Sequence, residues 1–140
     1  MVVLVQATVL TVGLNGRTEV LRELPIRLVK MQSGLEAARS LKNEKVNSVI
    51  SRWDLDDMPD GRFLKSFKAA KPYIPTIALV RSGSKAQEIA ARSLGVSAVL
   101  AEDTTDDVLR DTVANLLGIH GDAVKAILSA GNVEELMREG

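Results

Sequence analysis

The sequence contains no cysteine and a single histidine, His120. Without cysteine the chain has no disulfide, no thiolate nucleophile and no cysteine-ligated metal. A single histidine leaves no histidine-based metal cluster and argues against a Ser/His/Asp triad. We therefore expect no metal site and no catalytic residue built from these residue types.

An excess of either charge and a long apolar run are also missing. Eighteen basic residues balance eighteen acidic ones, so we expect no direct binding of nucleic acid. The apolar opening, residues 2–12, is interrupted by Gln6 and Thr8 and lacks a basic lead and a cleavage site. A membrane span needs about 20 apolar residues. These absences favour a cytoplasmic protein without membrane contact.

Short apolar runs rich in β-branched residues alternate with amphipathic segments, as expected for one domain of this length. Strands are predicted over residues 2–12, 26–31, 46–51, 76–80 and 98–101. Helices are predicted over residues 17–24, 33–42, 61–70, 84–95 and 104–118. This alternation predicts an α/β fold in which helices cover both faces of a five-stranded parallel sheet.

The domain is expected to span residues 1–118. Residues 119–140 contain two short amphipathic pieces, which form either a helical extension packed on the domain or a linker.

The sequence of the expected helices also predicts where they begin and which of their sides face the core. Ser33 and Glu36 form a capping box at the start of the helix expected over residues 33–42. Ser84 caps the helix expected over residues 84–95, and Thr104 or Thr105 caps the helix expected over residues 104–118. The inward stripes expected for the helices over 33–42 and 84–95 are Leu35, Ala38 and Leu41, and Ile89, Ala90 and Leu94.

The strand over residues 46–51 leads into a polar loop that ends at Gly61. Binding and chemistry gather at the carboxyl ends of strands in an open α/β sheet. The carboxylates of this acidic loop are Asp54, Asp56, Asp57 and Asp60. They form either an oxygen-ligated metal site or, as an alternative, a solvated group favoured by the following helix dipole. Trp53 is either an anchor for a partner protein or a residue packed on that helix.

Three segments together resemble the CheY-like response-regulator receiver domain. They are residues 49–61 with the acidic loop, residues 71–80 led by two prolines, and residues 94–100 led by Gly95. The resemblance covers roughly residues 2–118. It implies the flavodoxin-like strand order 2-1-3-4-5 and a role in two-component signal transduction.

The resemblance also implies a phosphoryl-transfer site. An aspartate at the end of the third strand accepts the phosphoryl group, and carboxylates after the first strand hold Mg²⁺. A Ser or Thr after the fourth strand senses the phosphoryl group, a lysine after the fifth strand pairs with it, and an aromatic residue in the fifth strand swings.

The residues at these positions depart from the family pattern. By similarity, Arg52 stands at the acceptor position, Val80 at the switch position, Glu102 at the lysine position and Val99 at the aromatic position. No acidic residue precedes Glu19. We therefore predict a degenerate pseudo-receiver, without cofactor or enzymatic activity, that regulates through protein–protein contacts and is not phosphorylated in the usual way.

The charges of Arg52 and Glu102 are inverted relative to the family pattern. One hypothesis is that they form an ion pair that holds the loops in one state without phosphate. The alternative is that both are solvated loop charges, each worth little to stability.

In receivers, the face made here by residues 85–117 commonly serves for dimerisation or output. We expect a protein partner, an output domain or a homodimer at this face. The interface residues expected are Arg92, Val99, Asp106 and Arg110.

Two other functions stay open. One is a small-molecule or anion-binding regulatory domain that uses Arg52, Arg81 and Ser82. The other is a residual phospho-accepting receiver that uses Asp54 or Asp57.

Overall fold

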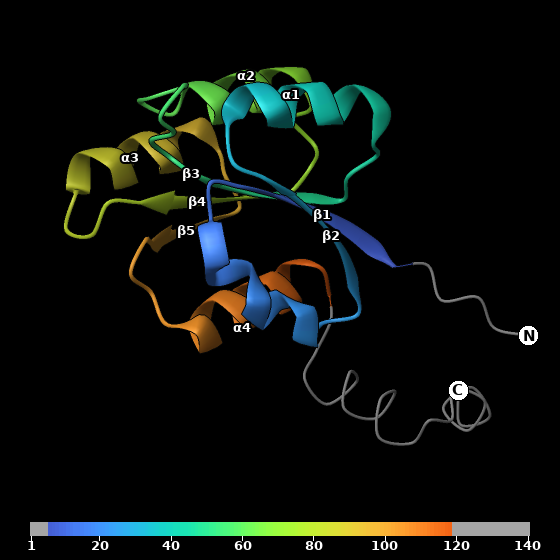
Figure 1. Cartoon of the computed structure of the whole chain (residues 1–140). Coiled ribbons are helices and arrows are strands. Elements are labelled where there is room, and N and C mark those ends of the chain that lie inside the picture. Colours follow the sequence, from blue (N-terminus) through green and yellow to red (C-terminus); the bar gives the residue numbers. More distant parts are fainter. Residues whose placement is uncertain (1–5, 119–140) are drawn as a thin grey trace, which may run out of the picture.

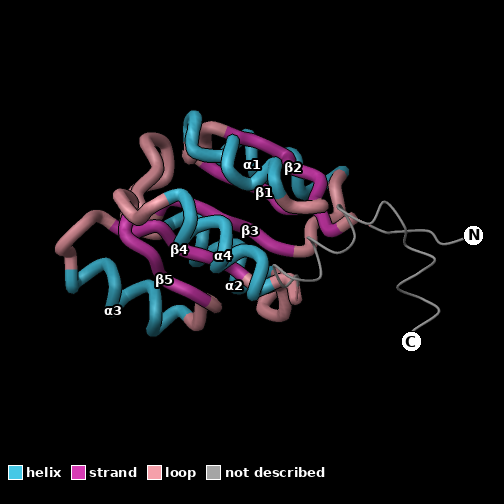
Figure 2. Tube along the Cα trace, turned by 90° about the horizontal axis from the view of Figure 1, so that it is seen from below, coloured by secondary structure: helices cyan, strands magenta, loops and turns pink. Residues whose placement is uncertain are grey.

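A parallel β-sheet forms the middle layer of the molecule (Figure 1). The structure is a computed structural model that describes residues 6–118. The strands are β1 (Ala7–Val12), β2 (Ile26–Met31), β3 (Ser48–Arg52), β4 (Thr76–Val80) and β5 (Ala98–Ala101). All pairs are parallel and the order is β2-β1-β3-β4-β5, which Figure 2 shows from one sheet edge to the other. The predicted α/β fold and its flavodoxin-like strand order are confirmed.

Five helices cover the two faces of the sheet. They are the 3₁₀-helix η1 (Asn15–Glu23) and the α-helices α1 (Gly34–Asn43), α2 (Arg62–Ala70), α3 (Lys85–Leu94) and α4 (Asp106–Leu116). Helices α1, α2 and α3 lie on one face, and η1 and α4 lie on the other (Figure 1). Residues 2–5 of the first expected strand and the expected extension over 119–140 lie outside the described residues.

Each face of the sheet has its own apolar core, because successive side chains of a strand point to opposite faces. In β1, Leu10 and Val12 pack toward α1, α2 and α3, whereas Val9 packs toward η1 and α4. The central strands are therefore buried on both sides, which explains why they are continuous apolar runs.

Hydroxyl side chains begin three of the helices, as the sequence predicts. Ser33 Oγ accepts from the Glu36 amide at 3.1 Å, and Ser84 Oγ accepts from the Gln87 amide at 3.3 Å. Of the two threonines proposed for the last helix, Thr105 is the cap. These caps satisfy amides that have no partner inside the helix.

The expected inward faces of two helices are wrong in part. Leu35 is 50% exposed and Ile89 is 64% exposed, whereas Ala37 and Ala91 are fully buried. Small side chains at Ala37 and Ala91 face the sheet, and this turns the larger residues outward. Ile89 is therefore an apolar side chain on the outer surface of α3.

The register of the parallel strands aligns their carboxyl ends at one edge of the sheet. Arg52 of β3 pairs with Leu79 of β4, and Val80 of β4 pairs with Ala101 of β5. The opposite edge carries the amino ends of the strands together with the carboxyl ends of α1 and α2 (Figure 1). Among residues 6–118, no helix is long and apolar enough to cross a membrane.

Candidate functional site

The loops that follow β1, β3, β4 and β5 meet at the carboxyl edge of the sheet. The structure brings together three positions singled out in the sequence, with Arg52 at the end of β3, Val80 at the end of β4 and Glu102 directly after β5. Val80 is buried and carries no hydroxyl that could sense a ligand. Of these three positions, only Arg52 and Glu102 carry polar side chains.

Arg52 and Glu102 face each other across the end of β4. Arg52 Nε lies 3.3 Å from Glu102 Oε1, and the two side chains are 34% and 32% exposed. Strands two places apart are about 10 Å from each other, a span that a long arginine and a glutamate can bridge. The pair ties the loop after β3 to the loop after β5.

The end of β1 offers no carboxylate to a metal ion. It is followed by Gly13, whose φ is +73°, and by the buried Leu14. A Cβ placed on Gly13 would lie 2.8 Å from Leu55 Cδ2 and 3.4 Å from Arg52 Cδ. Apolar groups thus fill the space beside this strand end. The residues at this strand end do not fit the Mg²⁺ ion that the resemblance implies, because Mg²⁺ needs hard oxygen ligands in near-octahedral geometry.

Arg17 of η1 holds the loop after β5 from its other side. Its guanidinium donates to the backbone carbonyl oxygens of Glu102 and Thr104, and Nη2 lies 3.1 Å from Asp106 Oδ1. Arg17 gives no signal in the sequence, since its partners lie at least 85 residues away and two of them are backbone atoms. The loop is thus fixed by Arg17 and Arg52 together.

Asp54 links the loop after β3 to the loop after β4. Asp54 Oδ1 accepts from the Asp60 amide at 2.7 Å. Its Oδ2 accepts from Gln87 Nε2 at 2.7 Å and from Arg81 Nη2 at 3.2 Å. The carboxylate is therefore engaged by protein donors on both oxygens.

Asp57 of the same loop caps α1. Its two carboxylate oxygens accept from the amides of Gly34 and Leu35, each at 2.9 Å. These bonds, that of Gly34 first, lower the pKa of Asp57 below its usual value. Asp56 is exposed. In the described part of the chain, no group of three or more His, Cys, Asp or Glu side chains is arranged to hold a metal ion.

Trp53 is part of the core and offers no anchor to a partner. Only 1% of it is exposed, and it packs in the apolar cluster beneath α1, α2 and α3. Lys65 Nζ lies 5.7 Å from the centre of its ring. Of the two interpretations of Trp53, the packing one is confirmed.

The expected interface residues lie on different sides of α3, β5 and α4. Arg92 is exposed on α3, and Val99 is half-buried in β5. Asp106 and Arg110 turn toward η1, where Arg110 Nη1 lies 2.9 Å from Glu23 Oε2. This contact is the main cause of the raised pKa of Arg110. A partner at this face stays a prediction.

The two arginines proposed for an anion site are each engaged by a carboxylate. Arg52 is engaged by Glu102 and Arg81 by Asp54, while Ser82 is exposed. The structure instead assembles cross-loop contacts, which we call the edge network. Its members are Arg17, Arg52, Asp54, Arg81, Gln87 and Glu102.

Curated relatives share sequence with most of this domain. The chain is 31% identical over 94 residues to the chemotaxis protein CheY homolog of Campylobacter jejuni strain 81-176, which covers 65% of the chain and 72% of that protein. It is also 31% identical over 90 residues to the transcriptional regulatory protein GlrR of Escherichia coli K12, covering 64% of the chain but 20% of that protein. No protein-family model matches the chain.

Solved structures share the fold at lower identity. The signal receiver domain of an HD domain-containing protein from Pseudomonas fluorescens Pf-5 has a TM-score of 0.73 and 20% identity, covering 81% of this chain and 95% of that one. The chemotaxis response regulator CheY4 of Vibrio cholerae has a TM-score of 0.70 and 17% identity, covering 80% and 99%. At these identities the likeness concerns the fold alone.

Proposed function

The chain belongs to the CheY-like response-regulator receiver family, and we propose that it is a pseudo-receiver. In this proposal it is a non-catalytic module of two-component signalling that works by protein contact. It is not phosphorylated in the usual way, and it acts in the cytoplasm.

The Arg52–Glu102 pair is the observation that carries the proposal. A guanidinium cannot accept a phosphoryl group or bind Mg²⁺, because it has no acceptor lone pair and stays positively charged. Glu102 stands where the resemblance places a lysine that pairs with the phosphoryl group, and it would repel that group. Both partners therefore oppose the chemistry that the family performs at these positions.

The pair also supplies a link that does not depend on a signal. In a working receiver, the phosphoryl group on the third strand and the lysine after the fifth attract each other. Here Arg52 and Glu102 make a link between the same strands with the signs reversed, at 3.3 Å. The bonds of Arg17 and Asp54 to neighbouring loops reinforce it. We infer that the edge network holds these loops in one permanent state.

A module that is held in one conformation can transmit information only through the partner proteins that it binds. The exposed side chains of Ile89 and Arg92 on α3 support a protein contact on that side of the domain. An output domain, a separate partner protein and a homodimer through α3, β5 and α4 are the forms that this contact takes in the proposal.

An amide-shift titration by NMR tests the proposal with Mg²⁺ and then with Mg²⁺ and beryllofluoride. We expect no saturable shift in residues 52–61, 80–84 or 102–105, because no carboxylate follows β1 and the carboxylates of Asp54 and Asp57 are already engaged by protein donors. Saturable shifts with Mg²⁺ that change again with beryllofluoride would contradict the proposal. The variants Asp54→Asn and Asp57→Asn would then show whether one of these aspartates is the acceptor.

A further inference from the structure

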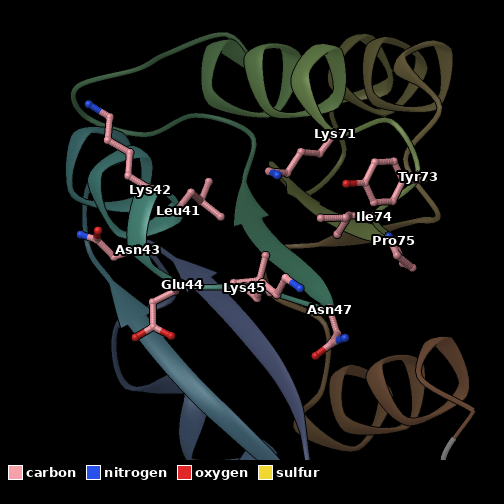
Figure 3. Close-up of a pocket in the computed structure, with 11 residues that line it drawn as sticks. Leu41, Lys42, Asn43, Glu44, Lys45, Asn47, Lys71, Tyr73, Ile74 and Pro75 are labelled. Carbon is pink, nitrogen blue, oxygen red and sulfur yellow. The ribbon is translucent and has the colours of Figure 1, made fainter.

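A second surface feature lies at the amino edge of the sheet, opposite the edge network. It is a hollow of about 550 Å³ between the end of α1, the loop into β3, the end of α2 and the loop into β4 (Figure 3). Its apolar floor includes Leu41, Val46 and Ile74. We call it the amino-edge pocket.

The amino-edge pocket carries more positive than negative charge. Lys42, Lys45 and Lys71 line it, and within residues 6–118 no carboxylate oxygen lies within 4.0 Å of their ammonium groups. The one lining acid, Glu44, is held by Arg27 through two contacts of 2.7 and 3.1 Å. The hollow is thus basic in a chain whose net charge is zero.

The side chains that line the pocket point in different directions. In Figure 3 the ammonium group of Lys71 and the hydroxyl of Tyr73 extend in the same direction, and the ammonium of Lys45 extends toward Asn47. The ammonium of Lys42 points away. Lys45, Lys71 and Tyr73 are therefore the groups placed to meet a ligand.

Helix-end electrostatics explain only part of this arrangement. Lysines near the carboxyl ends of α1 and α2 complement the helix dipoles, which accounts for Lys42 and Lys71. They do not account for Lys45 or for Tyr73, which is 77% exposed. An exposed tyrosine beside an apolar floor is typical of protein-binding surfaces, because its ring buries apolar area while its hydroxyl stays hydrogen-bonded.

We infer that the amino-edge pocket binds an acidic peptide segment of a partner protein. Carboxylates of the segment pair with Lys45 and Lys71, and an apolar side chain of the segment lies between Tyr73 and the floor. A nucleic acid fits less well, because the chain has no net positive charge and the pocket has no arginine. The inference rests on the proposed function, since it names the class of partner that a protein-binding module takes.

The probe is a short synthetic peptide with glutamates around a central Leu-Phe pair, titrated into the full chain and followed by amide shifts. A second peptide, with glutamine in place of every glutamate, is the control. We expect saturable shifts confined to residues 41–47 and 71–75 with the acidic peptide and a weaker response with the glutamine peptide. No saturable shift, or equal affinity for the two peptides, would overturn the inference.

Matched lysine variants locate the charge effect. Lys45→Gln and Lys71→Gln should each weaken the acidic peptide about two- to fivefold, the range of exposed ion pairs. Lys30→Gln, which removes an exposed lysine of β2 outside the pocket, should leave the affinity unchanged. Equal losses in all three variants would indicate nonspecific attraction and would refute the site.

Two further outcomes would assign the pocket to another occupant. If a single-stranded oligonucleotide binds the same residues more tightly than the peptide, the ligand is a nucleic acid and the inference is wrong. It is also wrong if Glu134→Gln or Glu135→Gln shifts the pocket amides of the free chain, because the chain's own terminal segment then occupies it. Either result leaves the beryllofluoride test at the opposite edge unaffected, so the two proposals fail separately.

Discussion

The Arg52–Glu102 pair should appear as a coupling free energy in a double-mutant cycle. Arg52→Met and Glu102→Gln are suitable variants, since each removes the charge and keeps most of the side-chain stem. The stem matters because Arg52 Cδ and Cγ approach Gly13, at 3.4 and 3.8 Å from where a Cβ would lie. Truncation of Arg52 to alanine would mix the loss of this packing with the loss of the ion pair.

The size of the coupling follows from the geometry. Two unit charges at the observed 3.3 Å attract by about 1.3 kcal/mol with the dielectric constant of water, and more strongly where water is partly excluded. Side-chain ordering offsets part of this attraction. Because both side chains are about one-third exposed, we expect a net coupling of about 0.5–1 kcal/mol.

Urea unfolding of the wild type, the two single variants and the double variant measures this coupling. The second substitution should cost little once the first is made. In 1 M salt the Debye length falls to about 3 Å, so the coupling should shrink. The same cycle on the more exposed Glu88 and Arg92 of α3 should give only about 0.3–0.5 kcal/mol. Additive losses for Arg52 and Glu102, or a coupling that salt does not change, would refute the hypothesis that this ion pair holds the loops together.

Two other substitutions, each with a control substitution, test the loop after β3 by urea unfolding. Gly61→Ala should lower the free energy of unfolding by about 2–5 kcal/mol, because φ is +70° and a Cβ would lie 2.3 Å from the Trp53 ring. Gly83→Ala, at a φ of +79° with open space, should cost only the backbone strain of about 1–2 kcal/mol, and equal losses would exclude a role for the ring. Asp57→Asn should cost about 0.5–2 kcal/mol at neutral pH, whereas Asp56→Asn should stay within about 0.5 kcal/mol. Because the folded-state pKa of Asp57 is lowered, its contribution is present above the unfolded pKa of about 3.9 and lost as the pH falls through the folded value; a pH-independent difference between wild type and Asp57→Asn would contradict it.

Most of the fold could be predicted because its signals are local. Apolar β-branched runs mark the strands, and Ser33 and Ser84 mark helix starts by bonds to amides only three residues ahead. The strand order came from the family resemblance. The rotation of α1 and α3 could not be predicted, because apolarity favours Leu35 and Ile89 while the helix-to-sheet packing selects Ala37.

The site was predictable where residue types carried the signal. Inverted charges at Arg52 and Glu102 led to the hypothesis of an ion pair, and the atoms of these residues lie 3.3 Å apart. Arg17 gave no such signal, because it bonds to backbone carbonyl oxygens far along the chain. Asp57 bonds to two backbone amides on another element, which any residue except proline supplies. Partners of this kind become visible only in the folded structure.

The residues at the carboxyl edge of the sheet that differ from the family pattern depend on one another. A substitution of Arg52 by aspartate would set two carboxylates across the end of β4 and would remove the arginine stem from Gly13. It would supply none of the missing carboxylates after β1, where Leu55 fills the space. A substitution of Glu102 by lysine would place two cations side by side. Each single step toward a phospho-accepting site thus loses a stabilising contact and gains no function, which is why we regard the edge network as one structural unit.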